Sequence, residues 1–191
     1  MSARPAPFSR ALLAQLRLEL TLSLRRGESL LITAVVPLLL LVFFGSIQFL
    51  PTASSRPVDF LLPGILALAV MSASLVGLGI ATAFERQQGV LKRLGGTPLP
   101  RGGLLLAKML AVVVIQLVQV TLLILVGALL FGWRPGPQAP LALPVIFLGT
   151  LCFAALGLLL AGTLRAEAVL AAANGLYLVF LLVGDMVIGD R

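Results

Sequence analysis

The sequence predicts an all-α protein that crosses a membrane several times, and three observations predict this class. Hydrophobic residues make up 60% of the 191 residues, and charged residues only 11%. The mean hydropathy is +1.13. Several apolar runs reach about 20 residues, which is the length of a transmembrane helix, and they lack the short alternating segments of a membrane β-barrel. We therefore predict a polytopic helical membrane protein, with residues 1–29 at the membrane surface and residues 30–191 as its transmembrane domain.

Residues 1–29 are predicted to form an amphipathic helix at the cytoplasmic membrane interface. Apolar residues recur at every fourth position of this segment: Phe8, Leu12, Leu16, Leu20 and Leu24. Leucines also alternate with polar residues here, as in a strand, but an isolated strand beside a membrane would leave its backbone groups unpaired. An interfacial helix is therefore favoured. A flexible leader that supplies only positive charge is the alternative.

Five transmembrane spans are predicted, at about residues 30–50, 60–83, 104–131, 141–162 and 168–184. The first run is too long for the apolar region of a cleaved signal peptide, and Pro37 should kink its helix. Small residues should allow close helix packing in the second and fourth spans. In the second span these residues are Ala69, Ala73, Gly77 and Ala81, and in the fourth they are Gly149, Gly157 and Gly162.

Three amide side chains lie inside the predicted spans. Gln116 and Gln119 are three residues apart in the third span, and Asn174 lies in the fifth. An amide within a membrane span either bridges two helices or lines a polar path for a substrate. Bridging is the simpler interpretation for the two glutamines, and the substrate path stays open as the alternative.

Basic residues are distributed very unequally over the predicted loops. With a cytoplasmic N-terminus, the outer segments hold Arg56, Arg134 and Arg191. The inner segments hold all the others: Arg4, Arg10, Arg17, Arg25, Arg26, Arg86, Lys92, Arg93, Arg101, Lys108 and Arg165. This is the bias of the positive-inside rule, so we expect the N-terminus and the loop around residue 90 in the cytoplasm. The same bias explains the net charge of +7 without a nucleic-acid partner.

The loop between the second and third spans is more ordered in its pattern than positive charge alone requires. Residues 85–94 place apolar Val90, Leu91 and Leu94 among charged residues, which predicts a short amphipathic helix on the membrane face. Gly95 and Gly96 should end this helix. We expect a structured cytoplasmic segment on which a soluble partner can act.

This loop, ERQQGVLKRLGGTPLPRGGLLLAK, resembles the cytoplasmic loop of ABC transporter permeases of the type 2 exporter class. The RRGES sequence before the span with Pro37 resembles the entry to the first span of that family. PGILA at 63–67 resembles the start of its second span, and the Ala173-Asn174 pair resembles a motif in its fifth. The resemblance covers essentially the whole chain.

The resemblance implies a permease that pairs with a second copy or a close relative and binds cytoplasmic ABC ATPase subunits. Those subunits would hold ATP and Mg²⁺ and drive efflux of drugs, lipids or polysaccharides across a plasma membrane of the bacterial inner membrane type. The matching residues of the ATPase-coupling segment are Glu85, Arg86, Gly89, Leu91, Lys92, Arg93 and Leu94. The family has six spans, so we expect that this chain, which ends at Arg191, is truncated before the sixth.

The composition speaks against catalysis by this chain. It has no histidine, its one cysteine (Cys152) lies in an apolar run, and it has no GxxxxGK[ST] phosphate loop. We expect no catalytic residue, no metal site and no cofactor bound by this chain, and an intramembrane enzyme is disfavoured because acids, bases or metal ligands do not converge.

Two other functions are alternatives to an ABC permease. An ion-coupled secondary transporter usually needs ionisable residues at mid-membrane, whereas here they lie near the span ends: Glu85, Lys108, Glu167 and Asp185. A non-transporting, truncated membrane scaffold is the other alternative.

Overall fold

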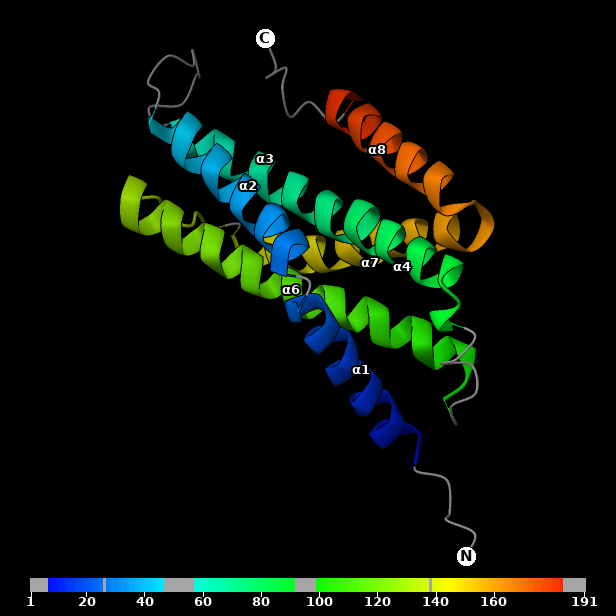
Figure 1. Ribbon diagram of the computed structural model, residues 1–191. Coiled ribbons are helices and arrows are strands. Elements are labelled where there is room, and N and C mark those ends of the chain that lie inside the picture. The colour runs from blue at the N-terminus through cyan, green and yellow to red at the C-terminus, as the bar shows by residue number, and fades with distance from the viewer. Residues whose placement is uncertain (1–6, 26, 47–56, 92–98, 138, 184–191) are drawn as a thin grey trace, which may run out of the picture.

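The computed structural model describes residues 7–25, 27–46, 57–91, 99–137 and 139–183 (Figure 1). Almost all of these residues are helical, and no strand occurs within the described ranges. The predicted class, a polytopic helical membrane protein, is confirmed. The elements are α1 (Phe8–Arg25), α2 (Gly27–Ser46), α3 (Pro57–Met71), the π-helix η1 (Ser72–Gly77), α4 (Leu78–Gln87), α6 (Arg101–Phe131), α7 (Ala139–Thr163) and α8 (Ala166–Val183).

Four helical segments of the described residues are long and apolar enough to cross a membrane: Leu61–Gln87, Arg101–Phe131, Ala139–Thr163 and Ala166–Val183. They lie at the predicted second to fifth spans. The predicted first span corresponds to α2, whose apolar part runs from Thr33 to Ser46, and the rest of that span, residues 47–50, lies outside the described residues. Pro37 is inside α2, and the kink expected there stays a prediction.

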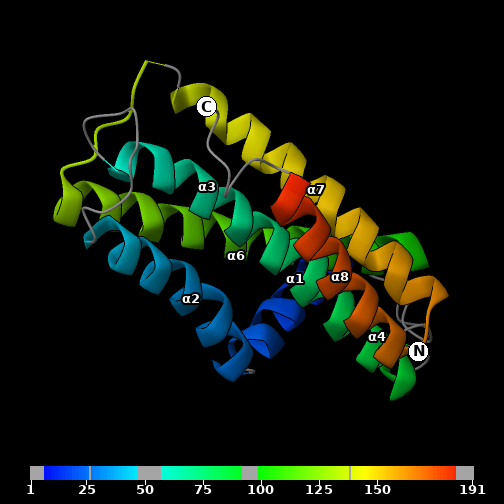
Figure 2. The same ribbon diagram turned by 90° about the horizontal axis from the view of Figure 1, so that it is seen from above.

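The continuous run α3–η1–α4 is the centre of the bundle. It packs against α2, α6, α7 and α8, and Figures 1 and 2 show it in the middle of these helices. It is also the most enclosed span, since 56% of its most apolar window is buried, compared with 39% for α6 and 17% for α7 and α8. The faces that α6, α7 and α8 turn outward carry large apolar residues, including Leu129, Leu148 and Leu178. Such faces suit contact with lipid.

The core consists of separate clusters along this central run. One joins α2, α3 and α6 around Leu41, Leu62 and Leu123. A second cluster, formed of small residues and Val169, joins α4 to α7 and α8 at the opposite end of the bundle. Small residues there let the helix backbones approach one another, which is the usual source of helix association in lipid.

The π-helix η1 was not predicted, and its packing explains why Gly157 is glycine. A Cβ atom on Gly157 would lie 2.8 Å from the carbonyl oxygen of Leu75 and 3.0 Å from that of Ser74. Close approach was predicted here and is confirmed for Gly157. At Gly149 a Cβ would make only ordinary contact with a side chain, and at Gly162 nothing lies within 4 Å, so the expectation was wrong for these two residues.

We therefore expect Gly157→Ala to lower the free energy of unfolding by about 1–3 kcal/mol, because the new methyl group meets backbone that cannot rotate away. Equilibrium unfolding in mixed micelles measures this effect. Gly162→Ala is the matched control on the same helix and should change the free energy by less than about 0.5 kcal/mol. Equal effects of the two substitutions would contradict the packing described here.

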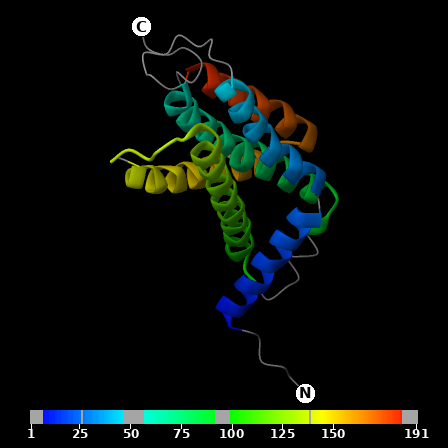
Figure 3. The same ribbon diagram turned by 90° about the vertical axis from the view of Figure 1, so that its left-hand side faces the viewer.

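Helix α6 is longer than a membrane requires, and α1 packs against its excess length. Its 31 residues extend for about 46 Å, whereas the hydrocarbon core of a bilayer is about 30 Å thick. Figure 3 shows α1 beside the N-terminal end of α6, where the Phe8 ring lies within 3.2 Å of the Cβ position of Gly103. The helix predicted within residues 1–29 is thus present, and it is attached to the bundle.

The buried side of α1 is not the leucine face that the sequence pattern suggested. The buried residues of α1 are Gln15 and Glu19, while Phe8 and Leu24 at the two ends of the predicted apolar stripe are exposed. The periodicity correctly indicates an amphipathic helix. The periodicity alone does not show that another part of the protein binds the polar side of α1.

Candidate functional site at the charged end of the bundle

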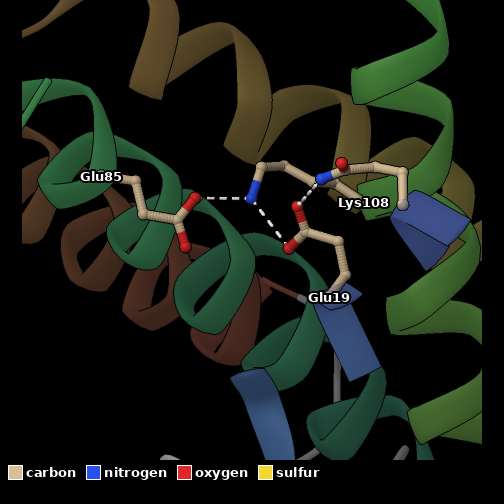
Figure 4. A network of polar contacts seen from close by, with 4 residues as sticks. Glu19, Glu85 and Lys108 are labelled. Carbon is tan, nitrogen blue, oxygen red and sulfur yellow. Dashed lines mark hydrogen bonds and ion pairs between the residues drawn. The ribbon is translucent and has the colours of Figure 1, made fainter. Parts of the chain in front are cut away.

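Three ionised side chains from three helices meet where α1 packs against the bundle. The Nζ atom of Lys108, in α6, lies 3.0 Å from Oε2 of Glu19 in α1 and 2.5 Å from Oε2 of Glu85 in α4 (Figure 4). All three residues are buried, with exposed fractions of 3% for Lys108, 7% for Glu19 and 5% for Glu85. We call this set the Glu19–Lys108–Glu85 network.

A fourth side chain joins the network. Nε2 of Gln15 donates a hydrogen bond of 3.0 Å to Oε1 of Glu19, four residues further along α1. Both oxygens of Glu19 therefore have a partner. A buried charge is tolerated only when it is paired and hydrogen-bonded, and one ammonium group here serves two carboxylates. The network therefore holds α1 against α4 and α6 in one defined position.

A small cavity with both polar and apolar lining adjoins the network. Its volume is about 90 Å³, and its lining includes Thr82 together with all three charged residues. The hydroxyl of Thr82 is buried and has no hydrogen-bond partner among the described residues. A cavity of this volume with several polar groups has room for ordered water.

The end of α4 is fastened to the turn between α7 and α8 by Arg86 and Gln87. The Arg86 guanidinium donates hydrogen bonds to the backbone carbonyl oxygens of Gly162 and Leu164. Nε2 of Gln87 donates a bond of 3.2 Å to Oε1 of Glu167. The last carbonyl groups of a helix lack partners within that helix, so Arg86 satisfies the end of α7 and positions α4 at the same time.

The start predicted for the amphipathic helix at 85–94 was wrong, and its predicted end lies outside the described residues. Helix α4 continues to Gln87, a turn follows at Gln88 and Gly89, and the chain is helical again at Val90 and Leu91. Gly89 has a φ of +74°, which a side chain other than that of glycine rarely adopts. This glycine is therefore the corner at which α4 ends.

The residues expected to couple to the ATPase consequently lie in different surroundings. Glu85 is buried in the network, and Arg86 is bound to the end of α7, so both position helices within this chain. Gly89 and Leu91 belong to the corner and to the helical turn after it. Lys92, Arg93 and Leu94 lie outside the described residues, and their expected contact with an ATPase stays a prediction.

The three membrane amides also differ from one another. Nε2 of Gln119 donates a 2.8 Å hydrogen bond to the backbone oxygen of Thr33 and so bridges α6 to α2. Gln116 is 98% buried, and neither Nε2 nor Oε1 of its side chain has a hydrogen-bond partner in the described part of the chain. Asn174 is exposed and donates to the backbone oxygen of Leu170 in its own helix. Of these residues, Gln119 has the geometry expected for bridging.

Sequence reasoning missed Glu19 and Gln15. Glu19 is the sole acidic residue before Gly27, in a segment that otherwise holds several arginines. An isolated carboxylate among arginines and leucines was a usable signal, and the Gln15–Glu19 spacing places both side chains on one face of a helix. The partner, Lys108, is 89 residues away, and no local pattern connects the two.

The described residues contain no cluster of His, Cys, Asp or Glu side chains that could hold a metal ion. The sequence pattern of the ABC-2 type transporter family matches residues 10–188, and the chain belongs to this family. It is therefore a transport permease of an ABC system, as its fold class and its membrane spans also indicate. The resemblance to ABC transporter permeases is thereby confirmed.

One curated relative is similar over most of the chain. It is a protein of Bacillus subtilis (strain 168) named "Putative transport permease YvfS", which is 29% identical over 166 residues. The aligned region covers 85% of this chain and 67% of that protein. No solved structure matches the chain significantly.

Proposed function

We propose that this chain is the transmembrane subunit of an ATP-driven exporter, and that it couples ATP hydrolysis in a separate ABC ATPase subunit to the export of a hydrophobic or amphipathic substrate. Drugs, lipids and polysaccharides are the substrate classes that the family resemblance implies. ATP and Mg²⁺ are bound by the ATPase subunit, and the permease works with a second copy or a close relative. Membership of the ABC-2 family supports this assignment.

The observation that carries the proposal is the Glu19–Lys108–Glu85 network. The cytoplasmic segment on which we expect the ATPase to act lies between α4 and α6, and the network joins the adjacent ends of these two helices. Glu19 adds α1 to the same network. A displacement of the segment would therefore move α4, α6 and α1 together, which is what force transmission from a soluble subunit requires.

The distribution of charge supports a plasma-membrane location with a cytoplasmic N-terminus. Among the described residues, Arg134 lies in the loop between α6 and α7, at the end of the bundle away from α1. The other described basic residues lie on the side of the network: Arg10, Arg17, Arg25, Arg86, Arg101, Lys108 and Arg165. By the positive-inside rule the network end faces the cytoplasm, where ATP is available.

The test is co-purification in mild detergent with the ABC ATPase encoded beside this chain. We expect the native chain to retain the ATPase and Arg93→Ala to weaken its retention about tenfold, as the loss of one charged interface contact does. Arg134→Ala is the matched control, because it removes an exposed arginine at the other end of the bundle. Failure of the native chain to retain the ATPase would contradict the proposal. Loss through Arg134→Ala alone would reverse the proposed orientation.

A further inference from the structure

A cavity of about 330 Å³ lies between α6 and α7, at the lower limit of the volumes found for small-molecule sites. Helix α6 contributes residues spaced along one face, and α7 contributes the turns around Pro144. The lining residues are Val113, Gln116, Leu117, Val120, Leu143, Pro144, Ile146, Phe147 and Thr150. None of them is ionisable, so the cavity suits an uncharged occupant.

In this cavity the buried carboxamide of Gln116 has no hydrogen-bond partner within the described part of the chain. Its carboxamide offers two N–H donors and one carbonyl acceptor, and neither nitrogen nor oxygen has a hydrogen-bond partner among the described residues. Thr150, the other polar lining residue, already donates its hydroxyl hydrogen to the backbone oxygen of Ile146 at 2.7 Å. Buried amides are normally hydrogen-bonded, so the unpaired amide of Gln116 indicates a missing partner.

The depth of Gln116 limits what that partner can be. It lies 15 residues before Phe131, the end of α6 away from α1, and therefore about 22 Å from that end along the helix axis, which is within a hydrocarbon core about 30 Å thick. Lipid tails offer no hydrogen-bonding group inside this core. A phospholipid chain could fill the cavity, but it could not pair with the amide.

The cavity is open to the lipid-facing side of the bundle. Leu117, Leu143 and Phe147 line it and are themselves about half exposed, at 51%, 55% and 45%. A ligand dissolved in the bilayer can therefore enter between α6 and α7 without passing through water.

We propose that this cavity binds an uncharged amphiphile, which pairs a hydroxyl group with the Gln116 carboxamide and packs its apolar body against α6 and α7. A hydroxyl group both donates and accepts, so one such group can satisfy either end of the amide. The proposal concerns binding alone, and it stands whether or not an ATPase drives this chain. If the exporter function holds, the ligand is a candidate cargo.

The test uses the full chain in phosphatidylcholine nanodiscs and three photoactivatable probes. They are a diazirine-bearing decanol, the matching decanoic acid and the matching decane, which differ only in the terminal group. Labelled peptides are identified by mass spectrometry over a range of probe concentrations. We expect saturable labelling of the segments that contain Leu117 and Phe147 by the alcohol, and only weak, non-saturable labelling by the acid and the hydrocarbon.

Gln116→Leu should weaken labelling by the alcohol about tenfold, which corresponds to the loss of one hydrogen bond to a buried group. Gln119→Leu is the matched control: it removes the other buried amide of α6, which binds Thr33 and does not line the cavity, and labelling should be unchanged. Leu143→Trp at the exposed rim should block labelling without disturbing the core. Unfolding in mixed micelles shows whether each variant is folded.

Equal labelling by alcohol and hydrocarbon would overturn the proposal, because the cavity would then accept any acyl chain. Equal labelling of the native chain and Gln116→Leu would overturn it as well. Absence of saturable labelling would mean that water or a helix of a second copy occupies the cavity. Crosslinking between copies through Leu143→Cys, with Cys152 replaced, separates those two cases, and either one contradicts the proposal.

Discussion

Lys108→Met is expected to lower the free energy of unfolding by about 3–5 kcal/mol, the usual cost of removing one partner from a buried ion pair. Methionine keeps the length and apolar volume of the lysine stem, so packing is largely preserved. What is lost is the ammonium group between Glu19 and Glu85. The two carboxylates would then be buried close to each other without the ammonium group that both contact.

Unfolding in mixed micelles, followed by fluorescence, measures this effect, because Trp133 is the one tryptophan of the chain. Arg101→Met is the matched control: it removes an exposed positive charge from the same helix and should change the free energy by less than about 0.5 kcal/mol. Adding Glu19→Gln and Glu85→Gln to Lys108→Met should recover most of the lost stability, because an uncharged set needs no counter-charge. Equal effects of the Lys108 and Arg101 substitutions would contradict the burial of the network.

Much of the fold follows from hydropathy and helix periodicity, because the length of an apolar run indicates a membrane span. The helices of the second to fifth spans lie where the apolar runs are, and α1 lies within the segment whose apolar residues recur at helical spacing. Gly157 was also predictable as a point of close approach, since small residues at helical spacing favour tight packing in lipid.

The helix boundary at Glu85 was not predictable in the same way. Glu85 is the first charged residue after an apolar run, so the sequence suggests that the span ends before it. In the structure the span continues through Gln87, because the ammonium group of Lys108 pairs with the Glu85 carboxylate and makes its burial possible. The location of this charge relative to the membrane core thus depended on a residue 23 positions away.

The same reasoning explains the contrast between Gln116 and Gln119. Both are glutamines on one face of α6, and their local sequences do not distinguish them. Gln119 meets the backbone oxygen of Thr33 because α2 passes beside it, whereas Gln116 faces a cavity beside α7. Tertiary packing alone decides which of the two amides bridges helices and which lines the cavity.

Glu19→Gln is expected to separate coupling from stability, provided that the exporter function proposed above is correct. The substitution leaves the Lys108–Glu85 ion pair intact, so one positive and one negative charge remain and the bundle should stay folded. It removes the charged link to α1. The new side chain has the size of the glutamate that it replaces, and the adjoining cavity has room for water beside its amide.

We expect this variant to retain the ATPase but to reduce, by about tenfold, the stimulation of ATP hydrolysis that follows addition of the permease. This magnitude is typical of the coupling free energy between two sites of a protein. The measurement compares ATP hydrolysis by the purified ATPase alone, with the native permease and with the variant, at saturating ATP. Gln119→Leu is the control, since it removes a helix-bridging amide distant from the network and should leave the stimulation unchanged. Full stimulation by a folded Glu19→Gln chain would show that α1 is held by the network but takes no part in coupling, and the force path would then run through α4 and α6 alone.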